Sequence, residues 1–156
     1  MHLVSNGDPI IFSILSIIRD VHLVNDGGEH ALDAVSLLFE PINAADDAAL
    51  NRLCCEVAKP VKPYQPDPAG LLEAVKNMQI RRTIYESFQT VPFVDVYDAR
   101  CRPYSSHWNM QRIDPANIEF GDTAVVECSV AKTCLPHATS WSTELDLMGI
   151  ALIRKH

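Results

Sequence analysis

The sequence has no run of basic residues, and its charge balance is negative. It carries 20 acidic and 13 basic residues, which gives a formal net charge of -7 at pH 7. A protein whose affinity for nucleic acid rests on neutralising phosphates needs clustered lysine and arginine. The balance argues against that class, although it does not exclude a local basic groove. The only basic clusters are Arg81-Arg82 and the pair Arg100 and Arg102, which we interpret as solvated surface.

Sequence motifs of catalysis are also missing. The chain has no Gly-x-Ser-x-Gly segment, no glycine-rich phosphate loop and no His-Glu-x-x-His segment. Three histidines lack a recognisable partner for nucleophilic catalysis: His22, His30 and His107. We therefore expect a protein that is not an enzyme and has no cofactor. The alternative is an enzyme whose pocket collects Asp95, Asp98 and His107.

The chain has no Cys-x-x-Cys pair of the kind found in many zinc sites. Five other residues offer the thiolate and imidazole ligands that zinc takes: Cys128, Cys134, His137, Cys101 and His107. Cys128, however, falls on the apolar face of an expected strand, where a thiol acts as a small hydrophobic group. We therefore predict no metal site.

Carboxylates near expected strand ends could hold a divalent cation or act in acid–base catalysis. They are Asp95, Asp98, Glu119 and Asp122. Their spacing matches no known ligand loop, and acidic residues at strand ends are ordinarily solvated. We interpret them as surface turns.

The five cysteines are odd in number and include the adjacent pair Cys54-Cys55, which indicates a reducing compartment. Cys54 falls on the buried stripe of an expected helix, so packing is favoured over a redox role. No secretory signal opens the chain, and the longest apolar run, residues 10–18, is too short to span a bilayer. We expect an intracellular protein, nuclear or cytoplasmic, without a membrane partner.

The clearest structural signal is near the end of the sequence. Apolar side chains fall at every second position in 124–130, with Glu127 and Ser129 on the opposite face, and they alternate with polar ones in 141–147. This pattern indicates two half-buried strands joined by a loop. The next apolar residues, Ile150 and Leu152, are out of phase with this alternation. We therefore predict a β-bulge near Met148-Gly149.

The first half of the chain suggests short strands between helices. We expect a strand at 10–12, a helix at 16–21, and a central parallel strand at 34–39, for which a helix starting at Glu29 is the rival. A helix capped by Asn43 or Asp46 follows, with a buried stripe of Leu50, Leu53, Cys54 and Val57.

Two further elements are expected before the hairpin. Asp67-Pro68 is a typical helix start, and Leu71, Leu72 and Val75 supply a buried stripe for a helix there. Ile84 and Phe88 belong to this helix or to another. Residues 91–97 form a strand, which Pro92 places at the edge of a sheet.

These elements predict an α+β protein. Residues 1–89 form an α/β lobe with short strands and two or three helices. Residues 90–156 form a β-rich lobe, an antiparallel sheet built on the long hairpin. We expect the two lobes to pack as one compact unit.

Residues 1–88 resemble a BRCT domain, a small α/β module of DNA-damage and chromatin proteins. The resemblance rests on the strand at 10–12, Gly27-Gly28, a buried strand ending at Pro41, and the leucine-bearing helix at 71–75. The tryptophan of the family's last helix is missing. No Ser-Gly or Thr-Gly pair matches the phosphate-holding pair of phosphopeptide-binding members, so no phosphopeptide site is implied.

The hairpin half resembles the closing strands of OB-fold single-strand-binding proteins. Such proteins stack bases on aromatic side chains over a positive groove. The aromatic residues available for stacking are Tyr97, Tyr104, Trp108 and Trp141. The positive groove is lacking, because residues 90–156 carry six basic and eight acidic residues. Nucleic-acid binding is therefore the disfavoured alternative.

The missing chemistry and the abundance of expected strand favour a protein–protein interaction or oligomerisation module. The apolar strand at 91–97 would pair with another chain, such as a second copy, by strand addition. The expected interaction surface consists of Val91, Phe93, Asp95, Tyr97, Arg100, Arg102, Tyr104 and Trp108.

Overall fold

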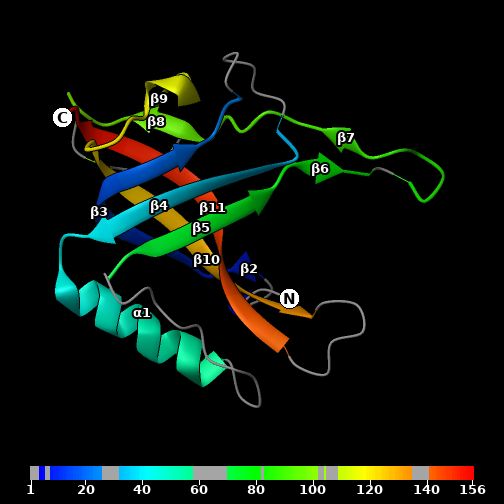
Figure 1. The fold of residues 1–156 in the computed structure, drawn as a ribbon, viewed down its shortest axis with the longest axis horizontal. Coiled ribbons are helices and arrows are strands. Elements are labelled where there is room, and N and C mark those ends of the chain that lie inside the picture. The colour runs from blue at the N-terminus through cyan, green and yellow to red at the C-terminus, as the bar shows by residue number, and fades with distance from the viewer. Residues whose placement is uncertain are drawn as a thin grey trace.

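The computed structural model describes residues 4–5, 8–25, 32–57, 70–81, 83–101, 104, 109–134 and 141–156. Seven strands of this part of the chain form one sheet (Figure 1): β3 Ile11–His22, β4 Ala34–Pro41, β5 Leu72–Asn77, β8 Val96–Asp98, β9 Gln111–Arg112, β10 Thr123–Cys134 and β11 Trp141–Arg154. Their order is β10-β3-β4-β5-β11-β8-β9. Two shorter pairs lie outside this sheet, β1 Val4–Ser5 with β2 Asp8–Pro9, and β6 Gln79–Ile80 with β7 Gln89–Thr90.

An additional pairing between β10 and β11 closes five of the strands into a barrel. The barrel runs β10-β3-β4-β5-β11 and returns to β10. The β5–β11 pair is parallel, and the other four pairs are antiparallel. A small five-stranded barrel is the architecture of the OB-fold. The predicted likeness of the hairpin to the closing strands of that fold therefore extends to the whole barrel.

The barrel interior is filled by every second side chain of its strands, as the strand period of two requires. These buried residues are Ile14, Ile18, Val35, Leu37, Phe39, Leu72, Ala74, Ala124, Val126, Cys128, Val130, Leu145, Leu147, Ile150 and Leu152. Each large apolar side chain of this kind contributes about 1.5–3 kcal/mol when it leaves water. The interior therefore holds strands from both halves of the sequence together.

The predicted hairpin is confirmed, because β10 and β11 pair from Cys134 and Trp141 back to the end of β11. The predicted bulge is confirmed as well. Cys128 lies opposite Leu147, but the preceding residue of β10 lies opposite Gly149, so Met148 is the extra residue. The bulge returns the apolar residues that follow it to the barrel interior.

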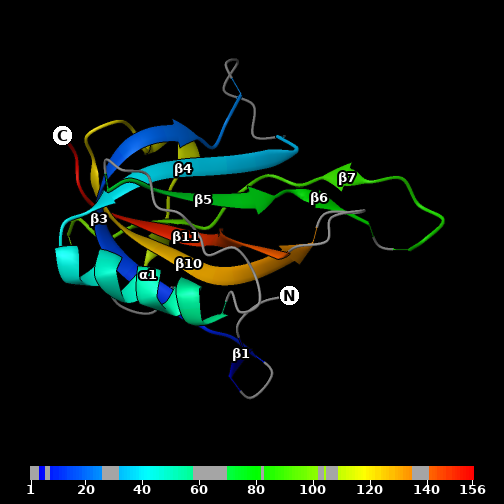
Figure 2. The same cartoon turned by 60° about the horizontal axis from the view of Figure 1, so that its bottom comes forward.

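The helix α1 Ala44–Val57 is also confirmed. It begins after Asn43, whose Oδ1 accepts a hydrogen bond from the backbone N–H of Ala45 at 3.0 Å. This is the predicted cap. Leu50 and Cys54 are buried in the same core as the strands, and α1 lies against the side of the barrel where β3 begins (Figure 2).

The predicted α+β class with two or three helices is wrong, because the described residues are mostly β and contain one α-helix. Residues 16–21, expected to be helical, continue the single strand β3. Residues 72–77, expected to follow a helix start at Asp67-Pro68, form β5; the start itself lies outside the described residues. The helix propensity of leucine, alanine and glutamate is overridden here, since β5 pairs with strands on both sides.

Two strand predictions need correction in their pairing. The strand at 34–39 exists as β4, but it is antiparallel to both of its neighbours, β3 and β5, and not a central parallel strand. In the segment 91–97 only the last two residues are strand, within β8. That strand pairs with β11 on one side and with β9 on the other, so it is not the free edge that strand addition needs.

Candidate functional site

The outer face of the barrel is acidic where OB-folds ordinarily bind ligands. In that fold, oligonucleotides and oligosaccharides lie over the second and third strands, which are β4 and β5 here. Outward-facing residues on these strands and on the adjoining β11 are Ser36, Leu38, Glu40, Glu73, Val75, Glu144 and Asp146. Glu40 is paired with Arg19, but no described cation forms an ion pair with Glu73, Glu144 or Asp146. Carboxylates without an ion-pair partner among the described residues are unfavourable neighbours for a phosphate backbone.

The carboxylates singled out in the sequence do not come together as one cluster. Asp95 accepts hydrogen bonds from Arg112 and from the Tyr97 hydroxyl, each at 3.1 Å. Asp98 is bound by the guanidinium of Arg100 at 2.7 Å, and this contact holds its pKa at about 2. Each carboxylate is thus neutralised by its own arginine. Among the described residues, no group of three or more His, Cys, Asp or Glu could hold a metal ion.

Glu119 and Asp122 meet at the C-terminal end of the chain, where Lys155 lies 2.8 Å from the first and 3.0 Å from the second. The carboxylate of Asp122 is 1% exposed, and it also accepts the backbone N–H groups of Glu119 and His156. Burial raises the pKa of Asp122, but these hydrogen bonds outweigh burial and hold the pKa below its ordinary value. The group ties the end of β11 to the turn before β10.

We expect acid to destabilise the protein partly through Asp122. Its pKa is depressed in the folded state, so its stabilising effect is complete above the unfolded value of about 3.9 and is lost as the pH falls through the folded pKa. Asp122→Asn should reduce this pH dependence and cost about 1–3 kcal/mol at pH 7. The measurement is urea unfolding between neutral pH and pH 3. Glu73→Gln, at an exposed carboxylate, is the control; an unchanged pH dependence in Asp122→Asn would contradict the role of Asp122.

The cysteines do not form a site in the described part of the chain. Cys128 lies in the barrel interior, and burial raises the pKa of its thiol to about 12, so it supplies no thiolate at neutral pH. Cys54 is buried in the same core, and Cys101 is exposed. The side chain of Cys134, together with His107 and His137, lies outside the described residues.

The expected interaction surface is scattered in the structure. Phe93 and Tyr97 are 1% and 4% exposed, so their side chains are not accessible to a partner. Val91 packs against the core. The hydroxyl of Tyr104 is hydrogen-bonded to Ser13 and Glu127.

The remaining residues of the predicted interaction surface are either engaged in ion pairs or outside the described residues. Asp95 and Arg100 are both engaged in ion pairs. Arg102 and Trp108 lie outside the described residues, as does the side chain of Trp141. The predicted alternative of an enzyme site gains nothing from the cavity described below, because neither Asp95 nor Asp98 lines it, and His107 lies outside the described residues.

A protruding hairpin, described at residues 79–81 and 83–90, is a better candidate site, and we refer to it as the arm. Its strands β6 and β7 pair antiparallel, with Gln79 opposite Thr90. The arm extends from the end of β5 away from the barrel, as Figures 1 and 2 both show. Because the arm extends away from the barrel, its side chains are accessible to a ligand from more than one side.

Large apolar and aromatic side chains crowd the far part of the arm. Tyr85 is 92% exposed, Ile84 72% and Phe88 60%. Arg81 lies over the ring of Phe88, with Cζ 5.6 Å from the ring centroid, and its Nε donates to the carbonyl of Thr83 at 2.8 Å. This contact holds a cation beside an exposed aromatic face.

The base of the arm is fixed to the loop before β4. Asp33 accepts a hydrogen bond from the Thr90 hydroxyl at 2.8 Å, and its backbone carbonyl accepts the N–H of Met78 at 2.9 Å. The Thr90 bond, with one from Gln79, lowers the pKa of Asp33. OB-folds use the loop between their first two strands in ligand binding, and Asp33 belongs to the corresponding connection between β3 and β4. The base of the arm is therefore next to a typical ligand-binding loop.

Sequence reasoning missed the arm for an identifiable reason. The sequence predicts that Ile84 and Phe88 belong to the helix after Asp67-Pro68 or to another helix, whereas residues 83–90 form no helix in the structure. The sequence signal that could have found the arm is the concentration of arginine and aromatic residues, since two of each fall within residues 81–88. Only the hairpin geometry shows that the aromatic rings are exposed.

No protein-family model matches the chain, and no curated protein does. Among solved structures, the chain is similar to gp2.5, a single-stranded DNA binding protein encoded by bacteriophage T7. The TM-score is 0.62 at 11% sequence identity, and the match covers 94% of this chain and 87% of that chain. The likeness shows a shared fold.

This match overturns the predicted BRCT resemblance of residues 1–88, because the similarity to an OB-like protein covers 94% of the chain and so includes that segment. The buried strand that ends at Pro41 exists, but as β4 it belongs to the barrel. The segment 71–75, expected to be the leucine-bearing helix, is instead occupied by the strand β5 from Leu72 onward. Within the described residues, no helix has the length and apolar character needed to cross a bilayer.

Proposed function

We propose that this chain binds single-stranded nucleic acid and that the arm makes the principal contact. The observation that carries the proposal is the exposed pair Tyr85 and Phe88, with Arg81 held over Phe88. The fold shared with gp2.5, whose name states that it binds single-stranded DNA, supports the same class of ligand. This was the disfavoured alternative on the sequence alone.

The arm suits single strands because base stacking needs an exposed base face. In a duplex, both faces of each base are already stacked, whereas a single strand can place a base on Tyr85 or Phe88. Stacking on an aromatic side chain contributes about 1–3 kcal/mol per base and tolerates any base. We therefore expect binding with little sequence preference and a dissociation constant on the order of micromolar.

The acidic outer face of β4, β5 and β11 explains why the contact would not lie over the barrel. A phosphate backbone there would meet Glu73, Glu144 and Asp146, none of which forms an ion pair with a described cation. The arm instead has Arg81 and Arg82 with a single acid, Glu86. A strand held by the arm would keep its backbone away from the acidic face.

The proposal predicts binding that depends only weakly on salt. Each phosphate neutralised on a single strand contributes a slope of about -0.7 to log K against log salt, so two arginines give about -1.4. Fluorescence anisotropy with a labelled oligothymidylate at several salt concentrations measures both affinity and slope, and the matching duplex is the control. Absence of binding at tens of micromolar protein in low salt, or equal affinity for the duplex, would refute the proposal.

A further inference from the structure

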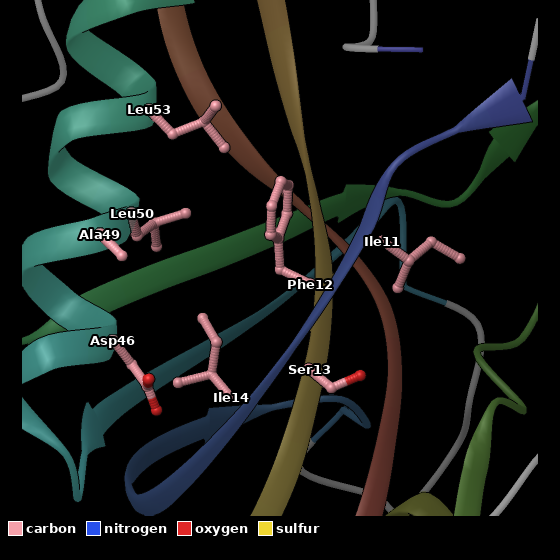
Figure 3. Close-up of a pocket in the computed structure, with 8 residues that line it drawn as sticks. All are labelled: Ile11, Phe12, Ser13, Ile14, Asp46, Ala49, Leu50 and Leu53. Atoms are coloured by element: carbon pink, nitrogen blue, oxygen red, sulfur yellow. The ribbon is translucent and has the colours of Figure 1, made fainter. Parts of the chain in front are cut away.

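A cavity of about 470 Å³ lies between α1 and the beginning of β3, away from the arm (Figure 3). Its lining residues are Ile11, Phe12, Ser13 and Ile14 from β3, and Asp46, Ala49, Leu50 and Leu53 from α1. Cavities of roughly 300–1,000 Å³ with apolar walls and few polar groups are typical of small-molecule sites.

The walls of the cavity are apolar on both sides. Figure 3 shows Phe12 and Ile14 pointing from β3 toward α1, and Leu50 and Leu53 pointing from α1 toward β3. Ala49, on the helix between them in space, leaves room because it has only a methyl group. An apolar chain bound in this cavity would be shielded from water by β3 on one side and by α1 on the other.

Asp46 gives the cavity a polar end. It is half-buried in the first turn of α1, and its Oδ1 accepts a long hydrogen bond of 3.3 Å from the amide of Asn43. Among the described residues it forms no ion pair. A carboxylate at the end of an apolar cavity is complementary to a cation on an apolar body, because the ion pair offsets the lost hydration of both groups.

We propose that this cavity binds a small apolar ligand that carries one ammonium group, with the ammonium at Asp46 and the apolar chain between Phe12 and Leu53. The site is independent of nucleic-acid binding by the arm. The chemistry of the walls excludes an anionic amphiphile, which would place its charge against a carboxylate.

The test compares three probes of equal chain length by isothermal titration calorimetry, each below its micelle concentration: decylammonium, decanol and decanoate. We expect one decylammonium per chain, bound at least about tenfold more tightly than decanoate, since the ion pair forms only with the ammonium. Equal affinity for the three probes, or no saturable binding of decylammonium, overturns the proposal.

Two pairs of variants locate the site. Ala49→Phe fills the cavity and should weaken decylammonium binding at least about tenfold, whereas Ala48→Phe adds the same ring at an exposed helix position outside the lining. Asp46→Asn should bring the affinity for decylammonium down to that for decanol, whereas Asp47→Asn, in the same turn, should not. Unchanged binding in Ala49→Phe overturns the proposal, as does concentration-dependent self-association that Ala49→Phe abolishes, because the face would then be a contact between copies.

The arm provides the control for independence. Tyr85→Ala with Phe88→Ala should leave decylammonium binding unchanged while it removes oligonucleotide binding. Circular dichroism and thermal unfolding confirm that each variant is folded before it is titrated. Failure of oligonucleotide binding in the wild-type chain would refute the role of the arm and leave the amine titration unaffected.

Discussion

Replacing Tyr85 and Phe88 together by alanine is expected to lower the affinity for single-stranded oligonucleotide by at least about thirtyfold, since two stacked bases account for about 2–6 kcal/mol. The two rings are 92% and 60% exposed, so their removal should leave the barrel intact. Fluorescence anisotropy at low salt measures the loss. Each single variant should show about half of it in free energy.

Phe120→Ala is the matched control for this experiment. Phe120 is 63% exposed, and Arg19 lies over its ring with Cζ 6.0 Å from the centroid, so it repeats the chemistry of the arm at another place. We expect its loss to change oligonucleotide affinity less than about threefold. Equal losses in Phe120→Ala and in the arm variants would mean that exposed aromatic residues bind nonspecifically, and the arm would have no special role.

The hairpin was predictable because its pattern is local and unambiguous. In β10 the residues Val126, Cys128 and Val130 alternate with Glu127 and Ser129, and a strand is the structure with that period. Even the bulge could be inferred, since the phase change at Met148 must be absorbed within the strand. The cap at Asn43 was readable for a similar reason, because the side chain bonds only two residues away.

The other strands were not predictable from such local signals. β5 contains leucine, alanine, glutamate and lysine, which favour helix, and only its pairing with β4 and β11 makes it a strand. In β3 the inner residues Ile14, Ser16 and Ile18 alternate, but the outer face also carries Leu15 and Ile17, which conceals the period of two.

The candidate site was missed for a connected reason. A helical interpretation of residues 84–88 does not predict a protruding hairpin, and the aromatic residues predicted to stack on bases lie further along the chain. Tyr97, one of these, lies on β8 and is buried in a small cluster with Met110 and Val125. The exposure of an aromatic ring depends on what covers it, and the covering residues here are distant in sequence.

Phe39→Ala is expected to cost about 3–5 kcal/mol of the free energy of unfolding, a large part of the 5–15 kcal/mol typical of a domain. Phe39 is fully buried, and on β4 it lies opposite Ile18 of β3 and Leu72 of β5. Urea unfolding monitored by circular dichroism measures the loss. The exposed Phe120→Ala variant, with the same change of side chain, should lose less than about 1 kcal/mol.

Phe39→Ala also tests the pairing of β4 with β5, which exists in the barrel but would not exist if residues 71–75 were helical. Leu72→Ala should also be strongly destabilising, and because Leu72 lies directly across from Phe39, the two substitutions should be non-additive by about 0.5–3 kcal/mol. Phe39→Ala combined with Phe120→Ala should be additive within about 0.5 kcal/mol. Additivity of Phe39→Ala with Leu72→Ala would mean that β4 and β5 are not neighbours, and the closed barrel that positions the arm would then be wrong.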